Sequence, residues 1–480
     1  MNALLAAISV ALCVGVAVIV PGGAAAVLVC AVAAVIAGAV ISRVEAQQRG
    51  FLLQIFVSGL LIRMMIGTLI NAFQLQDFFG GDALTYDQLG GAVAASWHAG
   101  IMQTAEVRDW ARAGGGWGML YLVGTIYAVT GRNMLAVQFF NSVIGAATAP
   151  VIFLCARHIF QNLRVAKVAA LLVAFYPSLM LWSSQGLKDG PIVFLLAVAM
   201  LATLKLGERL SVKYLVVLLT TMFSILSLRF YVFYMLVVAV GGAFIIGMRK
   251  ATSQSLGRQM LIILGAGLAL TYLGVLRGAG AQLESYGNLQ AVQTARSDQA
   301  QTTSGFSQDV DVSTTFGAMS AIPVGLIYLL FAPFPWQLAN LRQSITLTEM
   351  LVWWGSFPLL VMGVWFTVKY RLRQALPILI FTSMLTLAYS IFQGNVGTAY
   401  RQRAQILVFY FIFVAVGAVL VKEARESRRE NVKRAKHAAT TTMPADVRAE
   451  EARRRYDEWK REREKVMEDL ARGLSERINF

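Results

Sequence analysis

The chain has 480 residues, of which 57% are hydrophobic and only 14% are charged, whereas a typical soluble domain carries about 25% charged residues. This composition excludes an ordinary soluble fold and indicates an integral membrane protein. The formal net charge of +16 raises the question of nucleic-acid binding, but the basic residues fall mostly in short loops and in the C-terminal tail. That distribution is the positive-inside pattern of membrane proteins, so no nucleic-acid partner is expected.

Long apolar runs recur along the chain, and each is close to the ~20 residues that a helix needs to cross a bilayer. The runs are apolar on all sides, which is typical of membrane helices and not of helices with one core-facing stripe. The sequence therefore predicts an all-α, polytopic membrane protein, with its clearest spans at Ala3–Val20, Ala24–Ile41, Phe51–Ile70, Met134–Leu154, Val232–Gly247, Leu351–Val368 and Ile406–Val421.

Clusters of Lys and Arg assign the sides of the membrane, because cytoplasmic loops carry an excess of these residues. Arg43 and Arg49 follow the second run, and Arg157, Arg164 and Lys167 follow the fourth. Both loops are expected inside, so the third run leads outward and the fourth leads back inward. Similar clusters follow later spans and assign the rest of the chain in the same way.

This count leaves two apolar segments that do not cross the membrane. Trp117–Thr130 lies between an outward and an inward span, and at about 14 residues it is too short to cross. Ala321–Pro335 has the same position later in the chain, and its Pro333 and Pro335 agree with a broken or interfacial segment. We expect about 12 spans, both termini inside, and two interface helices on the outer face.

Two large outer loops and a cytoplasmic tail complete the expected organisation. The loops run from about 71 to 132 and from about 277 to 347, within a membrane domain over residues 1–421. In the second loop, Gln290–Thr315 is rich in Gln, Ser, Thr and Asp, which indicates a flexible segment; a lid beside an active site is the alternative. The basic tail, residues 422–480, is expected to form a helix along an anionic membrane surface or a docking helix for a cytoplasmic partner.

The first candidate site follows an outward span, at the start of the first outer loop. Gly80 and Gly81 allow a tight turn, and Asp82 comes directly after them. A carboxylate there can take a proton from a hydroxyl acceptor or help to hold a metal. The alternative is a simple N-cap of the following helix. Tyr86 and Asp87 continue this segment and are candidate substrate contacts.

Three later outer turns carry basic residues. Lys188 and Asp189 lie between an outward and an inward span, either as an interface pair or as a site for a phosphate or a sugar hydroxyl. Arg229 occupies the next turn, and Arg401 and Arg403 occupy the last. Arginines on the outer side oppose the positive-inside rule, and a guanidinium can donate two hydrogen bonds to a phosphate at once. They indicate a site for an anionic lipid-linked substrate, or else for ordinary lipid headgroups.

The sequence gives little sign of a cofactor. It holds no Walker A, zinc or Ser-His-Asp pattern, and its three cysteines lie in or beside apolar runs. A divalent cation at the carboxylates is the one candidate. Arg63 lies inside the third apolar run and is expected to face protein or a cavity, because exposure to lipid is costly.

The outer motifs resemble those of the GT-C superfamily of membrane glycosyltransferases, which includes bacterial lipid A aminoarabinose transferases and protein mannosyltransferases. The resemblance rests on the acidic motif Gly80–Tyr86 and on the turn from Tyr176–Leu179 to Leu187–Asp189. Interface helices in the first outer loop are a third shared feature. The resemblance covers roughly Phe51–Val421.

The resemblance implies an inverting enzyme that takes a sugar from a polyprenyl-phosphate carrier and transfers it to a glycan, lipid or protein acceptor. The reaction would take place at the outer face of the bacterial cytoplasmic membrane, in the synthesis of cell-envelope polysaccharide. Asp82 would be the general base and Asp189 a second catalytic residue, with Lys188 nearby. From their side and charge, Arg229, Arg401 and Arg403 are the candidates for binding the lipid phosphate, and Tyr400 is a candidate substrate contact.

Two other functions remain open at this point. A polysaccharide polymerase or ligase that uses a polyprenyl-diphosphate donor would need the same outer arginines. A transporter or flippase for a lipid-linked sugar would show paired repeats with broken helices that meet at the bilayer midplane, and the sequence has no convincing internal repeat.

Overall fold

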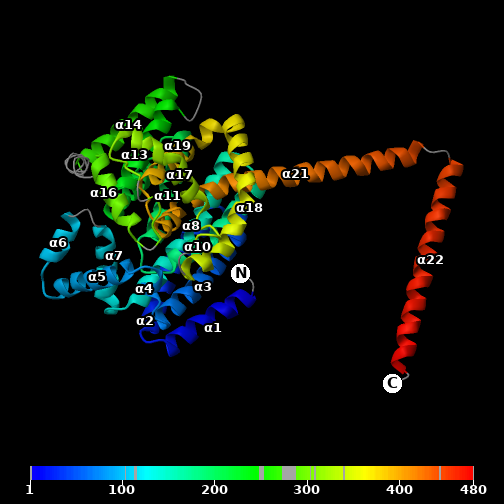
Figure 1. The fold of residues 1–480 in the computed structure, drawn as a ribbon, viewed down its shortest axis with the longest axis horizontal. Coiled ribbons are helices and arrows are strands. Elements are labelled where there is room, and N and C mark those ends of the chain that lie inside the picture. Colours follow the sequence, from blue (N-terminus) through cyan, green and yellow to red (C-terminus); the bar gives the residue numbers. More distant parts are fainter. Residues whose placement is uncertain are drawn as a thin grey trace. The chain divides into compact units, whose positions relative to one another are not determined.

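The computed structural model is almost entirely helical, which agrees with the predicted fold class (Figure 1). Within the described part of the chain, the only strand-like pairing is an isolated antiparallel bridge between Gly305 and Asn395. The chain divides into two compact units, Met1–Ala418 and Val419–Phe480. The structure describes residues 3–102, 104–112, 116–247, 253–272, 288–302, 304–307, 310–338, 341–442 and 445–478.

The first half of the chain contains α1 (Ala3–Ile19), α2 (Gly23–Val44), the short 3-10 helix η1 (Ala46–Gln48), α3 (Arg49–Ala72), α4 (Gln76–Phe79), α5 (Asp82–His98), α6 (Ala105–Arg112), α7 (Trp117–Thr130), α8 (Met134–Phe160), α9 (Leu163–Phe175), α10 (Pro177–Ser183), α11 (Asp189–Glu208), α12 (Val212–Leu228) and α13 (Phe230–Ile246). The second half contains α14 (Ser253–Tyr272), α16 (Leu289–Ala300), α17 (Thr315–Phe331), α18 (Leu341–Tyr370), α19 (Leu372–Phe392), α20 (Val396–Gln402), α21 (Ala404–Thr442) and α22 (Ala445–Ile478).

Seven helical segments of the described chain are long and apolar enough to cross a membrane, and they make the protein multi-pass. They contain α2, α3, α8, α11, α18, α19 and α21, and the bent pair α9 and α10 is an eighth if it forms one span. The helices α1, α12, α13 and part of α14 are apolar but shorter, as are α7 and α17, the two segments predicted not to cross. The expected number of about 12 spans and the cytoplasmic position of both termini stay predictions.

Helix α8 lies at the centre of the first unit. It is buried over most of its length and packs against α2, α3, α9 and α11. Small residues allow this close approach, as they commonly do between membrane helices. A Cβ atom at Gly145 of α8 would lie only 2.4 Å from the Cβ of Ser183. The turns that leave this bundle therefore start from rigid helix ends.

The first outer region is a packed helical unit. Helices α5 and α7 lie against each other, and a Cβ atom at Gly90 would come within 2.4 Å of a Val123 methyl group. Gly124 of α7 makes the reciprocal close approach to Val93, at 2.7 Å. Because neither glycine has a side chain, α5 and α7 pack closely against each other, and this packing holds α5 in place. The start of α5 carries Asp82.

The second outer region differs from the prediction. Gln290–Thr315 was expected to be flexible, but much of it forms α16 and a segment that packs onto α17. Val292 and Val312 form a small core there with two alanines of α17. Arg296 donates hydrogen bonds to the carbonyl groups of Ile391 and Gln393. The polar composition concealed these few inward-facing residues, and residues 277–287 of the predicted loop lie outside the described residues.

Helix α9 bends by 55° into α10, and the break is stabilised by two buried charged side chains. Pro177 has no backbone N–H to continue the helix. The freed carbonyl of Ala174 accepts a hydrogen bond from Arg63 Nη1 at 3.0 Å. The freed N–H of Ser178 donates to Glu349 Oε2 at 2.7 Å. Both backbone groups thus keep partners in a buried place, and α10 is turned toward the site described next.

Candidate active site

Four connections between helices of the first unit meet around a cavity of about 970 Å³. They are the α3–α5 connection, the α10–α11 loop, the α12–α13 junction and the turn at α20. Thr302, Ser304 and residues from the start of α18 complete the walls. The cavity is lined by Phe78, Phe79, Gly80, Asp82, Leu181, Trp182, Lys188, Leu228, Arg229, Phe230, Tyr231, Thr302, Ser304, Pro333, Leu341, Gln343, Ile345, Thr346, Asn395, Val396, Gly397, Thr398, Tyr400, Arg401 and Gln402.

Asp82 lies at the first position of α5, immediately after the expected glycine turn. Gly80 has φ +134°, a conformation that side-chain-bearing residues rarely adopt. The carboxylate of Asp82 makes no capping hydrogen bond, and the N-cap position belongs to Gly81. Instead, Asp82 Oδ2 accepts a hydrogen bond from Arg401 Nη1 at 2.7 Å. Asp82 lines the cavity, and 54% of its side chain is exposed there.

Asp189 lies behind the cavity wall and joins two arginines. Its side chain is only 1% exposed, at the first position of α11. Oδ2 accepts a hydrogen bond from Arg401 Nε at 2.7 Å, and Oδ1 accepts a longer one from Arg229 Nη2 at 3.4 Å. The sequence predicted Asp189 as a second catalytic residue, and in the structure both of its carboxylate oxygens accept hydrogen bonds from the arginines.

Arg229 occupies the one-residue junction between α12 and α13 and is 8% exposed. Its Nη1 is buried and has no hydrogen-bond partner within the described residues. A buried guanidinium N–H without an acceptor is costly. The positive charge of Arg229 would stabilise an anion that enters the cavity. Arg401 lies above the indole ring of Trp182, with 5.9 Å between its Cζ and the ring centroid. Both arginines line the cavity.

Lys188 adds a third cation. Its Nζ lies 5.9 Å from the ring centroid of Tyr86, which is itself buried in α5 and does not line the cavity. Burial is the largest cause that lowers the pKa of Lys188, and the positive charge of the neighbouring Arg229 is the next. The resulting pKa is about 8. Burial also opposes the charge of Arg401, but the carboxylates of Asp189 and Asp82 outweigh it and raise the pKa of Arg401.

Three other predicted substrate contacts lie differently from the expectation. Asp87 accepts hydrogen bonds from Arg132 Nε, at 3.0 Å, and from the Tyr127 hydroxyl group, so it joins α5 to α7 away from the cavity. Arg403 is fully buried and donates to carbonyl groups at the C-terminal end of α17. Tyr400 does line the cavity, but its hydroxyl group donates to Glu349 Oε2 at 2.8 Å.

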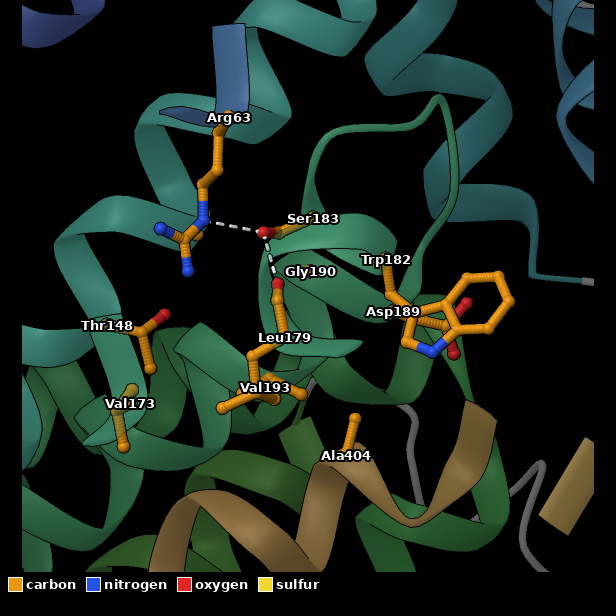
Figure 2. A pocket seen from close by; sticks show the side chains of 11 residues that line it. Arg63, Thr148, Val173, Leu179, Trp182, Ser183, Asp189, Gly190, Val193 and Ala404 are labelled. Atoms are coloured by element: carbon orange, nitrogen blue, oxygen red, sulfur yellow. Dashed lines mark hydrogen bonds between the residues drawn. The ribbon is translucent and has the colours of Figure 1, made fainter. Parts of the chain in front are cut away.

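A second cavity, of about 20 Å³, lies deeper in the bundle beside Arg63. Figure 2 shows Arg63 pointing toward Ser183, whose hydroxyl accepts from Arg63 Nε at 2.8 Å. The Asp189 carboxylate lies on the other side, near Trp182 (Figure 2). This space has room for about one water molecule and not for a substrate. Arg63 therefore faces protein, as expected for an arginine within an apolar run.

Neither carboxylate is part of an evident metal site. Among the described residues, no group of three His, Cys, Asp or Glu side chains is placed to hold a metal ion. Asp82 and Asp189 are bridged by Arg401, which already neutralises part of their charge.

Sequence reasoning missed Glu349 and the contact between Trp182 and Arg401. Glu349 is buried, and its Oε1 has no hydrogen-bond partner in the described part of the chain. An ionisable residue two positions before the apolar run Leu351–Val368 was a signal that could have identified it, because such residues are costly in a membrane. Trp182 lay within a recognised motif, but its contact with Arg401 joins distant parts of the sequence.

Residues 117–275 match the dolichyl-phosphate-mannose-protein mannosyltransferase family. Over this stretch the chain is similar to a GT-C type glycosyltransferase family. The match confirms the resemblance that the outer motifs indicated, and it spans about a third of the chain. It includes Lys188, Asp189 and Arg229, whereas Asp82 and Arg401 lie outside it. No curated protein matches the chain.

Proposed function

We propose that the protein transfers a sugar from a polyprenyl-phosphate carrier to an acceptor hydroxyl group in this cavity. The observation that carries the proposal is the pair of largely buried arginines that line the cavity, Arg229 and Arg401, of which Arg229 keeps a buried N–H without a protein acceptor in the described chain. A phosphate is the anion that such planar donors recognise. Apolar walls beside the arginines, including Phe78, Phe79 and Leu181, suit the lipid chain.

The reaction is a single displacement at the anomeric carbon of the sugar. The acceptor oxygen attacks that carbon, the bond from the carbon to the phosphate oxygen breaks, and its electron pair stays on the phosphate. Asp82 takes the hydroxyl proton of the acceptor as general base. Arg229, Arg401 and Lys188 stabilise the negative charge that develops on the departing polyprenyl phosphate, and this charge is larger in the transition state than in the donor.

The charge of the site favours a monophosphate donor. Lys188, Arg229 and Arg401 give three positive charges, and Asp82 and Asp189 give two negative ones, so the net charge is +1. A polyprenyl-phosphate sugar is a phosphodiester with one negative charge, which balances this value. A diphosphate donor, as a polysaccharide polymerase or ligase would use, carries about one charge more and would be less well neutralised.

The predicted topology is consistent with this reaction at the extracytoplasmic face of a bacterial cytoplasmic membrane. The chain would cross the membrane twelve times if α9 and α10 form one span and α7 and α17 lie outside. This number of crossings would leave both termini inside. The four helix connections that meet at the cavity would then all lie on the outer side. The basic tail, residues 422–480, would contact anionic lipid or a cytoplasmic partner from the other side.

The test is transfer from radiolabelled polyprenyl-phosphate sugars in proteoliposomes, with cell-envelope acceptors and with or without a divalent metal. Wild type should give labelled product, and Asp82→Asn should give none while it remains folded. Asp87→Asn is the matched control, because Asp87 lies on the same helix but outside the cavity. Turnover with diphosphate donors alone would instead favour the polymerase or ligase, and transport without transfer would favour the flippase.

A further inference from the structure

One wall of the cavity is polar but uncharged. It consists of Ser304, in the segment that follows α16, and of Thr398 and Gln402 on α20, and we call these three residues the neutral wall. Gln402 Oε1 accepts hydrogen bonds from Gln393 Nε2 at 2.8 Å and from the Tyr231 hydroxyl at 3.4 Å. Its Nε2, together with the hydroxyl groups of Ser304 and Thr398, has no hydrogen-bond partner in the described part of the chain.

The neutral wall is held in place by backbone hydrogen bonds. Val396 N donates to the Ser304 carbonyl at 2.9 Å, and Phe306 N donates to the Gly394 carbonyl at 2.8 Å. Thr398 N donates to Asn395 Oδ1 at 3.0 Å, which caps α20. These bonds join the second outer region to the turn that carries Arg401. The backbone that carries the unpaired polar groups is therefore held in place before a ligand arrives, which lowers the entropic cost of binding.

The neutral wall begins next to the arginines. Thr398 and Arg401 are three residues apart on α20, so their Cβ atoms are about 5–6 Å apart. Gln402 accepts from Tyr231, and the Arg229 guanidinium lies 5.8 Å from the centre of the Tyr231 ring. A sugar whose phosphate is bound by these arginines would therefore lie next to the neutral wall.

We propose that Ser304, Thr398 and Gln402 form a subsite for the hydroxyl groups of an uncharged sugar, and that this subsite selects a neutral sugar on the lipid donor. The inference rests on the proposed function, because it takes the donor phosphate to lie on the arginines. The hydroxyl and amide groups of the wall match sugar hydroxyls, which both donate and accept. A carboxylate or ammonium group on the sugar would lose water at the wall without gaining an opposite charge.

Binding to the protein in lipid nanodiscs tests the subsite, because maltoside detergents would themselves present uncharged sugars. The probes are farnesyl-phosphate glucose, its glucuronic acid and glucosamine counterparts, and farnesyl methyl phosphate, a diester without a sugar. In wild type, calorimetry should give the glucose lipid the highest affinity of the four. Thr398→Val or Gln402→Leu should reduce its preference over the methyl diester by about two- to tenfold each, the effect of one or two lost hydrogen bonds.

Thr346→Val is the matched control. Thr346 lines the same cavity, but its hydroxyl already donates to the Gln343 carbonyl at 2.8 Å, so the preference for glucose should not change. Equal or tighter binding of the charged sugars, or an unchanged preference in the Thr398 and Gln402 variants, would overturn the proposal. If these variants instead raise the KM for a glycan acceptor and leave donor binding intact, the wall binds the acceptor sugar.

Failure of the proposed function would look different. None of the four lipids would then bind in a way that depends on Arg229, and Arg229→Met would leave all four affinities unchanged. Failure of the subsite alone leaves the affinity for the methyl diester dependent on Arg229 and only removes the discrimination among sugars.

Discussion

Arg401 Nη1 lies 2.7 Å from Asp82 Oδ2, while Arg401 Nε lies 2.7 Å from Asp189 Oδ2. One guanidinium thus connects the proposed general base with the buried carboxylate that positions the arginines. A phosphate that takes Nη1 must compete with Asp82 for it. Donor binding and the release of Asp82 for proton transfer are therefore coupled by the same nitrogen atom.

Replacing Asp82 by Asn should have opposite effects on donor binding and on turnover. The variant loses the base, so transfer should fall to background. It also frees Arg401 and raises the net positive charge, so a polyprenyl-phosphate sugar should bind more tightly. Because Asp82 is half exposed, its ion pair is worth about 0.2–1 kcal/mol, and the gain in donor affinity should be about 1.4- to fivefold. Equilibrium binding of a donor, measured beside single-turnover transfer, checks both effects.

The control for this prediction is Asp87→Asn, which should change neither donor affinity nor the rate of the chemical step. Weaker donor binding in Asp82→Asn would mean that Asp82 contacts the donor itself, for example through a sugar hydroxyl. That outcome would contradict the competition between phosphate and carboxylate for Arg401.

The pKa of Lys188 predicts how donor capture depends on pH. Because burial and Arg229 lower this pKa to about 8, Lys188 is charged below that pH and loses its charge above it. A neutral amine attracts a phosphate less strongly, so kcat/KM for the donor should be level below pH 7 and fall as the pH rises through about 8. The profile of kcat/KM reports the free enzyme and is the measurement to make.

Substitution of Lys188 separates this group from others that titrate at alkaline pH. Lys188→Arg should move the fall in kcat/KM above pH 9, because arginine keeps its charge. Lys188→Met should give a low and level kcat/KM over the same range. If the Arg variant keeps the same alkaline limb near pH 8, another group is responsible.

Part of the site could be predicted because it depends on local sequence. The apolar runs predicted most of the long helices, and the position of each loop predicted which turns share a side. The Gly80-Gly81 pair predicted the turn before Asp82, and Gly80 adopts a conformation that glycine favours. The convergence of Asp82 and Asp189 on Arg401 could not be predicted, since it depends on how three distant turns pack.

The misplaced predictions have a common geometric reason. Arg401 and Arg403 are two residues apart, and residues at that spacing lie on different sides of a helical turn. Arg401 consequently faces the cavity, while Arg403 faces α17. Asp82 and Asp87 are five residues apart on α5 and likewise point to different partners. Charge and topological side alone did not distinguish the members of either pair.

Arg403 should be essential for stability and dispensable for donor binding. Its Nη1 lies within 3.0 to 3.3 Å of the carbonyl oxygens of Leu329, Leu330 and Ala332, which have no further helical turn to pair with. Arg403→Met leaves the buried carbonyls of Leu329 and Ala332 unpaired, at a cost of about 1–3 kcal/mol each, whereas the Leu330 carbonyl keeps its hydrogen bond from Trp353 Nε1. The melting temperature in nanodiscs should fall by several degrees, whereas the donor affinity of the folded fraction should stay within twofold of wild type.

Arg229→Met is the converse case. It should lower donor affinity at least tenfold, because one or two charge-assisted hydrogen bonds to the phosphate are worth about 1.5–3 kcal/mol each. Its melting temperature should change less than that of Arg403→Met, although Asp189 retains only Arg401 and Lys188 near it. Loss of donor affinity in Arg403→Met at full stability would show that Arg403 does reach the substrate.

Glu349 should control activity from outside the cavity, through the two helices that it joins. Its Oε2 accepts from the Ser178 N–H of α10 and from the Tyr400 hydroxyl of α20. These helices carry Trp182 and Arg401, which are in contact. Glu349→Ala removes both bonds, should lower the melting temperature, and should raise the donor KM more than it lowers kcat. Glu349→Gln keeps an acceptor oxygen at the same place and should restore most of both properties.

Two further variants separate positioning from general stability. Tyr400→Phe removes one of the two hydrogen bonds, so its effect on the donor KM should lie between those of wild type and Glu349→Ala, about two- to tenfold for one bond. Tyr370→Phe, at the exposed end of α18, should have no effect. A Glu349→Ala protein that melts early but keeps the wild-type donor KM would reduce Glu349 to a structural role. A raised donor KM in Glu349→Ala that Glu349→Gln reverses would show that the helix break at Pro177 helps to position Arg401 for the phosphate.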